Sequence, residues 1–250
     1  MILKDFHTHT TYCDGKNTPE EMLLSAIEKG LTTYGFSGHG YTDFDLRYCM
    51  TLEKTELYKR DIRALKEKYK DKIEVLLGIE LDVFSNYPTD DFDYVIGSAH
   101  YVTKNGVYRD IDENPEVFEA ICREWFDGDY YAFAEYYFAQ VERIFDVTKV
   151  DIIGHIDLIT KFNEGNKYFD VKNPRYVKAY QKAIDKLVTF NKPFEINMGA
   201  ISRGYRTEPY PALDILEYIK KKGGKLILSS DSHSKENVAY QYDKWAHLLG

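Results

Sequence analysis

The sequence predicts an α/β fold in which parallel strands and helices alternate around a closed barrel. Short apolar runs alternate with longer amphipathic segments about seven times, which is typical of parallel β/α units. Six of the seven histidines follow the ends of those apolar runs. All strand C-termini of a barrel open on one face, whereas an open sheet offers ligands only the crevice at its switch point. We therefore expect an irregular barrel of seven strands, with a metal site at the C-terminal face of the strands.

The expected strands are short, and several are rich in Val and Ile, as strands buried on both faces should be. They cover residues 2–6, 33–37, 73–83, 94–98, 151–154, 194–197 and 225–229. Because successive strands are separated by helical patterns, the strands are expected to run parallel.

The expected helices begin at local sequence signals. Thr18 is expected to cap a helix, with Pro19 in its first turn and Glu21 completing a capping box. The Asn-Pro pair at 173–174 and the Tyr-Pro pair at 210–211 predict two further helix starts.

The segment of about 101–147 is longer than one crossover between strands requires. Its second half, residues 130–145, is crowded with aromatic side chains. We favour a helix that packs by an aromatic stripe, and a substrate lid over the site is the alternative. Residues 1–250 are treated as a single domain, because α/β barrels often fill this length as one unit.

Histidine and carboxylate side chains gather at the ends of the expected strands. Residues two apart on a strand share a face, so His7 and His9 can place two ligands in one cavity. The same spacing relates Asp231 and His233. His247 lies on the expected C-terminal helix and is not a candidate ligand. The remaining candidates each stand at or just beyond the end of an apolar run of their own, and they are His39, Glu80, His100 and His155.

This combination of residue types indicates a cluster of metal ions. Neutral imidazole and carboxylate are ligands for Zn, Mn and Fe, and the constellation contains no thiolate. The ligands are too many for a single ion of four- to six-fold coordination. We therefore expect two or three divalent ions, with a carboxylate such as Glu80 bridging a pair and a metal-bridging hydroxide as the nucleophile.

Taken in order, the motifs resemble those of the polymerase-and-histidinol-phosphatase (PHP) superfamily over almost the whole chain. The motifs are Asp5-Phe6-His7-Thr8-His9, Asp14-Gly15, Phe36-Ser37-Gly38-His39, Gly78-Ile79-Glu80, Gly97-Ser98-Ala99-His100, Gly154-His155-Ile156-Asp157 and Ser230-Asp231-Ser232-His233. The segments similar to the histidinol-phosphatase branch are 92–102, 108–112, 195–197, Arg203 and 209–211.

The resemblance implies a distorted, TIM-like (β/α)7 barrel with a trinuclear metal site. The ligands that it implies are His7, His9, Asp14, His39, Glu80, His100, His155, Asp231 and His233. The implied activity is hydrolysis of L-histidinol phosphate to L-histidinol and phosphate, a step of histidine biosynthesis. Glu80, Asp231 and His233 would take part in catalysis.

Recognition of a phosphate ester requires cationic side chains on the same face of the barrel. Arg203 follows the strand that ends at Asn197, and its planar guanidinium suits a phosphoryl group. Lys161 and Arg206 are further candidates for phosphate binding. Glu195 and Asn197 share one strand face, where they could hold a ligand in place, bind substrate or fill a polar layer of the core.

Three functional classes compete. We favour a histidinol-phosphate phosphatase acting on a small phosphate ester. The first alternative is another phosphoesterase on the same site: a small-molecule phosphatase, a phosphodiesterase or an exonuclease. A non-catalytic metal-binding module is the second alternative. The formal net charge of −8 argues against long nucleic acid, whose binding needs a basic surface.

Cysteine content and hydropathy bear on the compartment. Cys13, Cys49 and Cys122 are scattered and odd in number, and we expect reduced thiols in a cytoplasmic protein. The N-terminus is too short and too polar for a signal peptide, and no apolar stretch of about 18 residues is present to span a membrane. The oligomeric state is not indicated.

Overall fold

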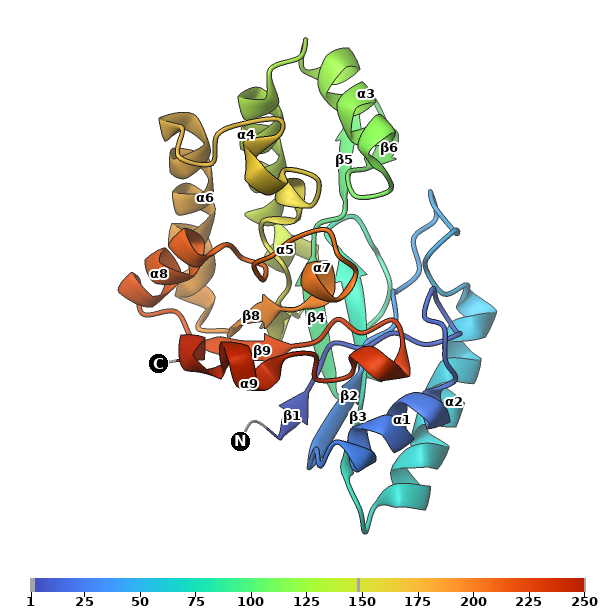
Figure 1. The fold of residues 1–250 in the computed structure, drawn as a ribbon. Helices are drawn as coiled ribbons and strands as arrows, with labels where there is room; N and C mark the ends of the chain where they lie inside the picture. The colour runs from blue at the N-terminus through green and yellow to red at the C-terminus, as the bar shows by residue number, and fades with distance from the viewer. Residues whose placement is uncertain (1–2, 148, 250) are drawn as a thin grey trace.

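The computed structural model describes residues 3–147 and 149–249, and a parallel seven-stranded sheet lies at its centre (Figure 1). The strands of this sheet, in spatial order, are β1 (Lys4–Asp5), β2 (Thr33–Phe36), β3 (Glu74–Asp82), β4 (Tyr94–Ser98), β7 (Ile152–Ile153), β8 (Phe194–Asn197) and β9 (Leu226–Ser229). The seven expected runs each contain one of these strands. Ile2, the expected start of the first strand, lies outside the described residues.

The sheet closes into a distorted barrel just beyond the ends of β1 and β9. A parallel bridge joins Thr8 to Ser232. The backbone N–H of His9 donates to the carbonyl oxygen of Ser232 at 2.9 Å, and that of Ser232 donates to the carbonyl oxygen of His7 at 3.3 Å. The predicted α/β barrel is thus confirmed, and its closure joins two segments that carry candidate ligands.

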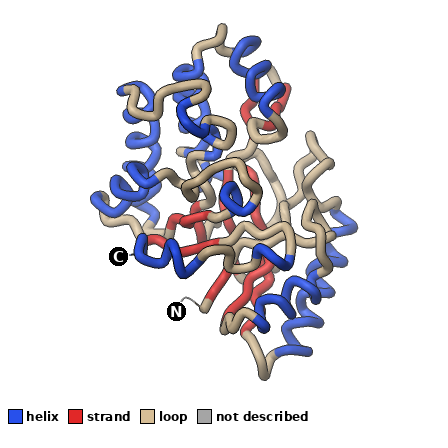
Figure 2. Tube along the Cα trace, viewed as in Figure 1, coloured by secondary structure: helices blue, strands red, loops and turns tan. Residues whose placement is uncertain are grey.

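Helices surround the strands, which occupy the middle of the molecule in Figure 2. The α-helices are α1 (Pro19–Glu28), α2 (Leu52–Tyr69), α3 (Pro115–Trp125), α4 (Tyr130–Val141), α5 (Ile144–Val147), α6 (Pro174–Leu187), α7 (Gly199–Ser202), α8 (Leu213–Lys221) and α9 (Tyr242–Trp245). The Thr18 capping box and the start of α6 at Pro174 are confirmed. No helix in the described ranges is long and apolar enough to cross a membrane.

The helix start predicted at residues 210–211 is wrong by a few residues. Helix α8 begins at Leu213, and Ala212 precedes it as the N-cap. Tyr210 instead forms an antiparallel bridge with Asn197, with N···O distances of 2.7 and 3.0 Å. The backbone of Tyr210 is therefore used to hold the end of β8 in place.

The long segment after β4 forms a hairpin followed by three helices. Strands β5 (Tyr101–Lys104) and β6 (Val107–Asp110) pair antiparallel, and α3, α4 and α5 follow. Aromatic side chains of α4, among them Phe133, Tyr137 and Phe138, are buried, and α4 packs against α6. The aromatic segment therefore packs as a helix, as expected, and it is the hairpin that approaches the site.

The described cysteines form no disulfide, as the scattered spacing predicted. Cys49 and Cys122 are buried, and Cys13 is half-buried. His247 is exposed on a short 3-10 helix, where its Nδ1 lies 2.9 Å from the carbonyl oxygen of Lys244. His247 is therefore separate from the other histidines.

Candidate metal centre

All nine candidate ligands converge at the C-terminal ends of the strands. Four groups place one ligand atom from each member within 4.8 Å of the others. The groups are His7–His9–Asp231, His7–Glu80–His155, His39–Glu80–His100 and His9–Asp14–His39–His233. The chain thus offers overlapping sites for several ions.

Glu80 lies at the centre of the cluster and is fully buried. Its Oε2 atom lies 3.1 Å from Nε2 of His7 and 3.0 Å from Nδ1 of His39. Its Oε1 atom lies 3.3 Å from Nε2 of His155 and 3.5 Å from Nε2 of His100. His9 also approaches Oε2, with its Nε2 at 3.6 Å. Each carboxylate oxygen therefore faces at least two imidazoles, an arrangement that suits a carboxylate bridging two ions.

Two further carboxylates flank this centre. Asp231 Oδ1 lies 3.2 Å from Nε2 of His9. Asp14 lies 3.1 Å from Nε2 of His233 and 3.7 Å from Nε2 of His39. His39 contacts both Asp14 and Glu80, so it lies between two of the groups rather than in one alone.

The hydrogen bonding of the buried ligand atoms tests whether metal ions fit this site. Nε2 of His7 and of His9, Oδ1 of Asp14 and Oε2 of Glu80 have no hydrogen-bond partner among residues 3–147 and 149–249. An unpaired buried polar group costs about 1–3 kcal/mol, and more when charged. A divalent cation between these atoms removes that cost, and the nitrogen and oxygen donor set suits Zn, Mn or Fe. The residues fit the metal cluster.

The electrostatics of the cluster keep its carboxylates ionised. Burial raises the pKa of Glu80, but the charges of His7 and His39 outweigh it and hold that pKa well below its usual range. Burial and the neighbouring His233 lower the pKa of His9 to about 3, so His9 is neutral. Burial lowers the pKa of His7, yet Glu195 and Glu80 raise it well above normal, so metal binding must displace a proton there.

Several residues contact the candidate ligands from outside the cluster and hold them in position. The carboxylate of Glu195 lies 2.7 Å from Nδ1 of His7, and Ser98 donates to Oε1 of Glu80 at 2.6 Å. Asp82 accepts a hydrogen bond from the backbone N–H of His100 at 2.6 Å. Sequence reasoning missed Asp82 and Ser98, although Asp82 stands two residues after Glu80 on the same face of β3.

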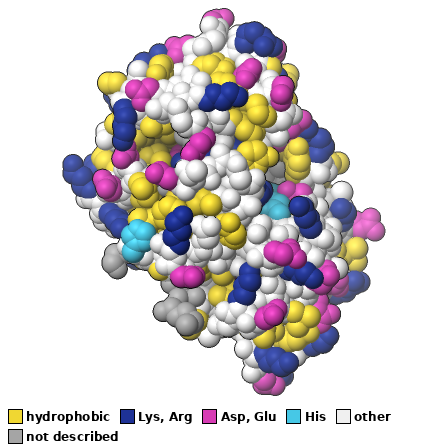
Figure 3. Space-filling view, viewed as in Figure 1, with side chains coloured by type: hydrophobic (Ala, Val, Ile, Leu, Met, Phe, Trp, Pro, Cys, Tyr) yellow, Lys and Arg dark blue, Asp and Glu magenta, His cyan; other side chains and the backbone are white. Residues whose placement is uncertain are grey.

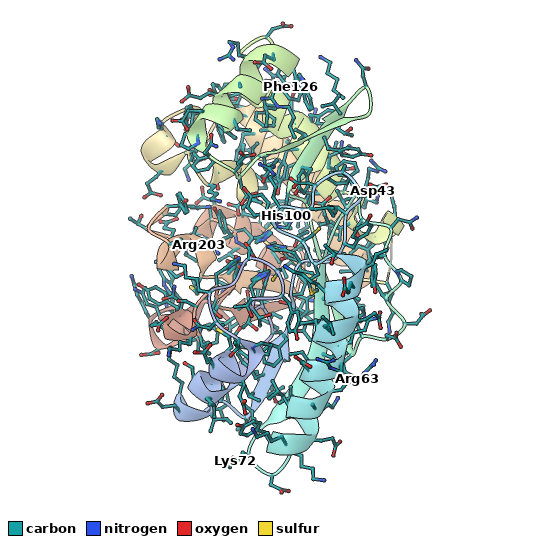
Figure 4. The ribbon with its side chains drawn as sticks, turned by 90° about the vertical axis from the view of Figure 1, so that its right-hand side faces the viewer. Asp43, Arg63, Lys72, His100, Phe126 and Arg203 are labelled. Atoms are coloured by element: carbon teal, nitrogen blue, oxygen red, sulfur yellow. The ribbon has the colours of Figure 1, made fainter. Side chains whose placement is uncertain are left out.

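A cavity of about 280 Å³ opens above the cluster. Its walls combine the metal-site residues with loop 40–49, the β5–β6 hairpin and the segment after His155. Figure 4 places His100 and Arg203 in the middle of the molecule, below the segment with Phe126 and above that with Arg63. On the face drawn in Figure 3, histidine side chains reach the surface in only small areas. The cavity can therefore bring a small molecule to the ligands.

A model of the PHP domain family matches residues 5–199, a segment that carries seven of the nine candidate ligands. The chain belongs to the PHP domain family. A Deinococcus radiodurans protein named "Probable histidinol-phosphatase" is 29% identical, over 96% of this chain and 90% of the relative.

Two solved structures resemble this PHP domain. A proposed histidinol phosphatase from Listeria monocytogenes has a TM-score of 0.83 at 21% identity, over 97% of this chain and 99% of that one. The histidinol phosphate phosphatase of Lactococcus lactis, solved with zinc, L-histidinol and phosphate, has a TM-score of 0.74 at 20% identity. That match covers 98% of this chain and 92% of the other. These likenesses confirm the predicted fold.

Arg203 lines the cavity of this PHP domain beside Asp231. Its Nη2 donates to Oδ2 of Asp231 at 3.1 Å and its Nη1 to the Asp231 carbonyl oxygen at 3.3 Å. Nη1 also lies 2.8 Å from Nδ1 of His233. Gly199 lies beneath this pair, and a Cβ atom there would approach Oδ2 of Asp231 to 2.3 Å. Close packing therefore explains the glycine.

The other expected substrate contacts differ in their placement. Lys161 lines the cavity, where its Nζ lies 2.9 Å from Oδ2 of Asp112. Arg206 is buried outside the cavity lining and donates to Thr160 at 2.6 Å. Asn197 is also absent from the lining, and its side chain bonds to Glu195 and to the backbone of Gly199. These contacts give Arg206 and Asn197 positions that support the barrel.

Proposed function

We propose that this chain is a metal-dependent phosphatase that hydrolyses L-histidinol phosphate to L-histidinol and phosphate. The proposal rests on one observation. The same cavity is lined by the candidate metal ligands, by the guanidinium of Arg203 and by a set of carboxyl groups. The name of the Deinococcus relative and the zinc, L-histidinol and phosphate of the Lactococcus structure point to the same substrate.

The nine clustered residues would hold two or three divalent ions, with Glu80 bridging. Such ions supply Lewis-acid activation of water and neutralise charge on the phosphoryl group. The protein's contribution is to fix these ligands in a buried site at the base of the cavity, where little water competes.

Arg203 would bind the phosphoryl group at the edge of this cluster. Its side chain is 28% exposed and lines the cavity, so part of the guanidinium is available to a ligand. Burial raises the pKa of Asp231, but Arg203 and His7 outweigh it and hold that pKa well below its usual range. Asp231 is therefore ionised at neutral pH, the form in which a carboxylate can bind a metal ion.

The acidic part of the cavity lining suits the cationic end of an amino alcohol phosphate. It contains Asp110, Asp112 and Glu113. Two of these carboxylates already form ion pairs within the protein: Asp112 with Lys161, and Glu113 with Arg47 at 2.7 Å. Asp110 is buried and has no cationic side chain within ion-pair distance in the part of the chain that the structure describes. A substrate ammonium would provide that missing partner and, as a nearby positive charge, would favour the ionised form of Asp110.

The cavity also favours a small monoester over a polymer. Its volume of about 280 Å³ accommodates a compact ligand. The carboxylates of Asp112 and Glu113 would repel the phosphates of a polynucleotide.

The experiment compares kcat/KM of the zinc-loaded protein for L-histidinol phosphate, p-nitrophenyl phosphate and bis-p-nitrophenyl phosphate. Histidinol phosphate is expected to be the best substrate and the diester the poorest. Preference for the diester would overturn the monoesterase assignment, and equal rates for the two monoesters would overturn the choice of histidinol phosphate.

A further inference from the structure

Glu195 on β8 accepts four hydrogen bonds although its side chain is fully buried. Oε2 lies 2.7 Å from Nδ1 of His7 and accepts from the hydroxyl of Ser229 at 2.6 Å. Oε1 accepts from the backbone N–H of His155 at 2.6 Å and from Nδ2 of Asn197 at 3.0 Å. One carboxylate therefore links β8 and β9 to the segments that follow β1 and β7.

The contact with His7 determines which ring nitrogen carries a proton. An ionised carboxylate can only accept a hydrogen bond, so Nδ1 of His7 must be the protonated nitrogen. In neutral His7 the lone pair then resides on Nε2. That atom lies 3.1 Å from the carboxylate of Glu80 and 3.7 Å from that of Asp231, and no described residue forms a hydrogen bond with it.

We infer that Glu195 is a positioning residue that fixes the metal-binding tautomer of His7 and, through the backbone of His155, the placement of a second ligand. A carboxylate paired with a metal-bound imidazole orients the ring and increases its basicity. The inference rests on the proposed metal site but not on the proposed substrate, because zinc binding is measured without any phosphate ester.

The variant Glu195→Gln tests the tautomer directly, because an amide cannot accept four hydrogen bonds. The backbone N–H of His155 can only donate a hydrogen bond. The side-chain amide of Asn197 is fixed in orientation, because its Oδ1 accepts from the backbone N–H of Gly199 at 2.7 Å, so its NH₂ group must also donate. The new NH₂ group must therefore face His7 and Ser229, since both can become acceptors. Nδ1 of His7 would then accept, and the ring proton would move to Nε2, the atom that faces the ions.

Two matched variants separate this role from simple support of the fold. Ser229→Ala removes the other donor to Oε2 but leaves the bond to His7 in place. Glu195→Asp keeps the charge but draws the carboxylate back by one methylene. The zinc affinity of each protein is measured by competition with a fluorescent chelator, together with the melting temperature of the metal-free form.

Glu195→Gln is expected to weaken zinc binding about 10–100-fold, with Glu195→Asp intermediate and Ser229→Ala closest to wild type. Wild-type zinc affinity in Glu195→Gln would overturn the inference. So would equal losses in Glu195→Gln and Ser229→Ala, since that result would assign Glu195 to the fold alone. If Glu195→Gln does not fold, Glu195→Asp decides: zinc binding no weaker than in Ser229→Ala contradicts the role.

Discussion

Arg203 donates hydrogen bonds to both the side chain and the backbone carbonyl of Asp231, at 3.1 and 3.3 Å. Asp231 has a left-handed backbone conformation, with φ of +47°, which is uncommon for a residue other than glycine. Arg203 therefore has two roles to test: it stabilises the conformation of a candidate metal ligand, and it offers a charge to the phosphoryl group.

Replacing Arg203 should reduce turnover of every phosphate monoester. A charge-assisted hydrogen bond is worth about 1.5–3 kcal/mol, so Arg203→Ala is expected to lower kcat/KM roughly ten- to a hundredfold on histidinol phosphate and p-nitrophenyl phosphate alike. Arg203→Lys keeps the positive charge but loses the planar guanidinium with its paired N–H donors, so its kcat/KM should lie between those of wild type and Arg203→Ala. Steady-state kinetics on both esters check this, and unchanged kcat/KM in Arg203→Ala would exclude a phosphoryl contact.

The metal centre should hold more than one ion. Ligand atoms of nine residues fall into four overlapping groups, which exceeds the coordination shell of a single ion. Elemental analysis of the purified protein is expected to find more than one equivalent of Zn, Mn or Fe. At most trace metal, together with full activity in a strong chelator, would contradict the proposed centre.

Removing the Glu80 carboxylate should abolish most activity while preserving the fold. Glu80→Gln is expected to lower kcat by orders of magnitude, because Glu80 contacts imidazoles of several groups. His100→Ala should also lower kcat strongly. Far-UV circular dichroism monitors the fold, and His247→Ala is the matched control because that histidine is exposed and outside the cluster. Near-normal turnover in Glu80→Gln would show that Glu80 is not a ligand.

Asp110 should discriminate between substrates. If it binds the ammonium of histidinol phosphate, Asp110→Asn should lower kcat/KM for that ester roughly ten- to a hundredfold, with a much smaller loss on p-nitrophenyl phosphate. Glu113→Gln is the comparison variant, because Glu113 already pairs with Arg47. Equal losses of Asp110→Asn on both esters would exclude a specific contact with the ammonium.

The same variant should change how stability depends on pH. Burial and the neighbouring Asp112 raise the pKa of Asp110 from 3.8 to about 9. The folded state thus favours the neutral form of Asp110. The contribution of this group to the free energy of unfolding is fully present below about pH 4 and is lost as the pH rises towards 9. Asn cannot ionise, so the melting temperature of Asp110→Asn should rise relative to wild type between pH 5 and pH 8. If the difference in melting temperature between Asp110→Asn and wild type stays constant from pH 5 to pH 8, Asp110 is not neutral in the folded protein.

Much of the ligand cluster could be predicted because it depends on local sequence. His7 and His9, or Asp231 and His233, lie two residues apart at strand ends, and a barrel brings all such ends together. Each expected strand was found within a few residues. That the nine residues bind metal stays a prediction, as does the single-domain organisation.

The contacts around the cluster could not be predicted, because they depend on how distant segments pack. The pairing of Asp82 with His100 depends on the register of β3 against β4. Tyr48 lines the cavity only because loop 40–49 folds over it. Arg206 follows the same strand as Arg203, and only tertiary packing buries it against Thr160 rather than in the cavity. Spacing in the sequence does not contain this information.

The most direct test measures phosphate release from L-histidinol phosphate by the protein as purified, after removal of metal by a chelator, and after reloading with zinc. The account predicts rapid release by the purified protein, loss of activity on stripping, and recovery on reloading, with little release from bis-p-nitrophenyl phosphate in any state. Undiminished release from histidinol phosphate by the stripped protein, or none by the zinc-loaded protein, would contradict it.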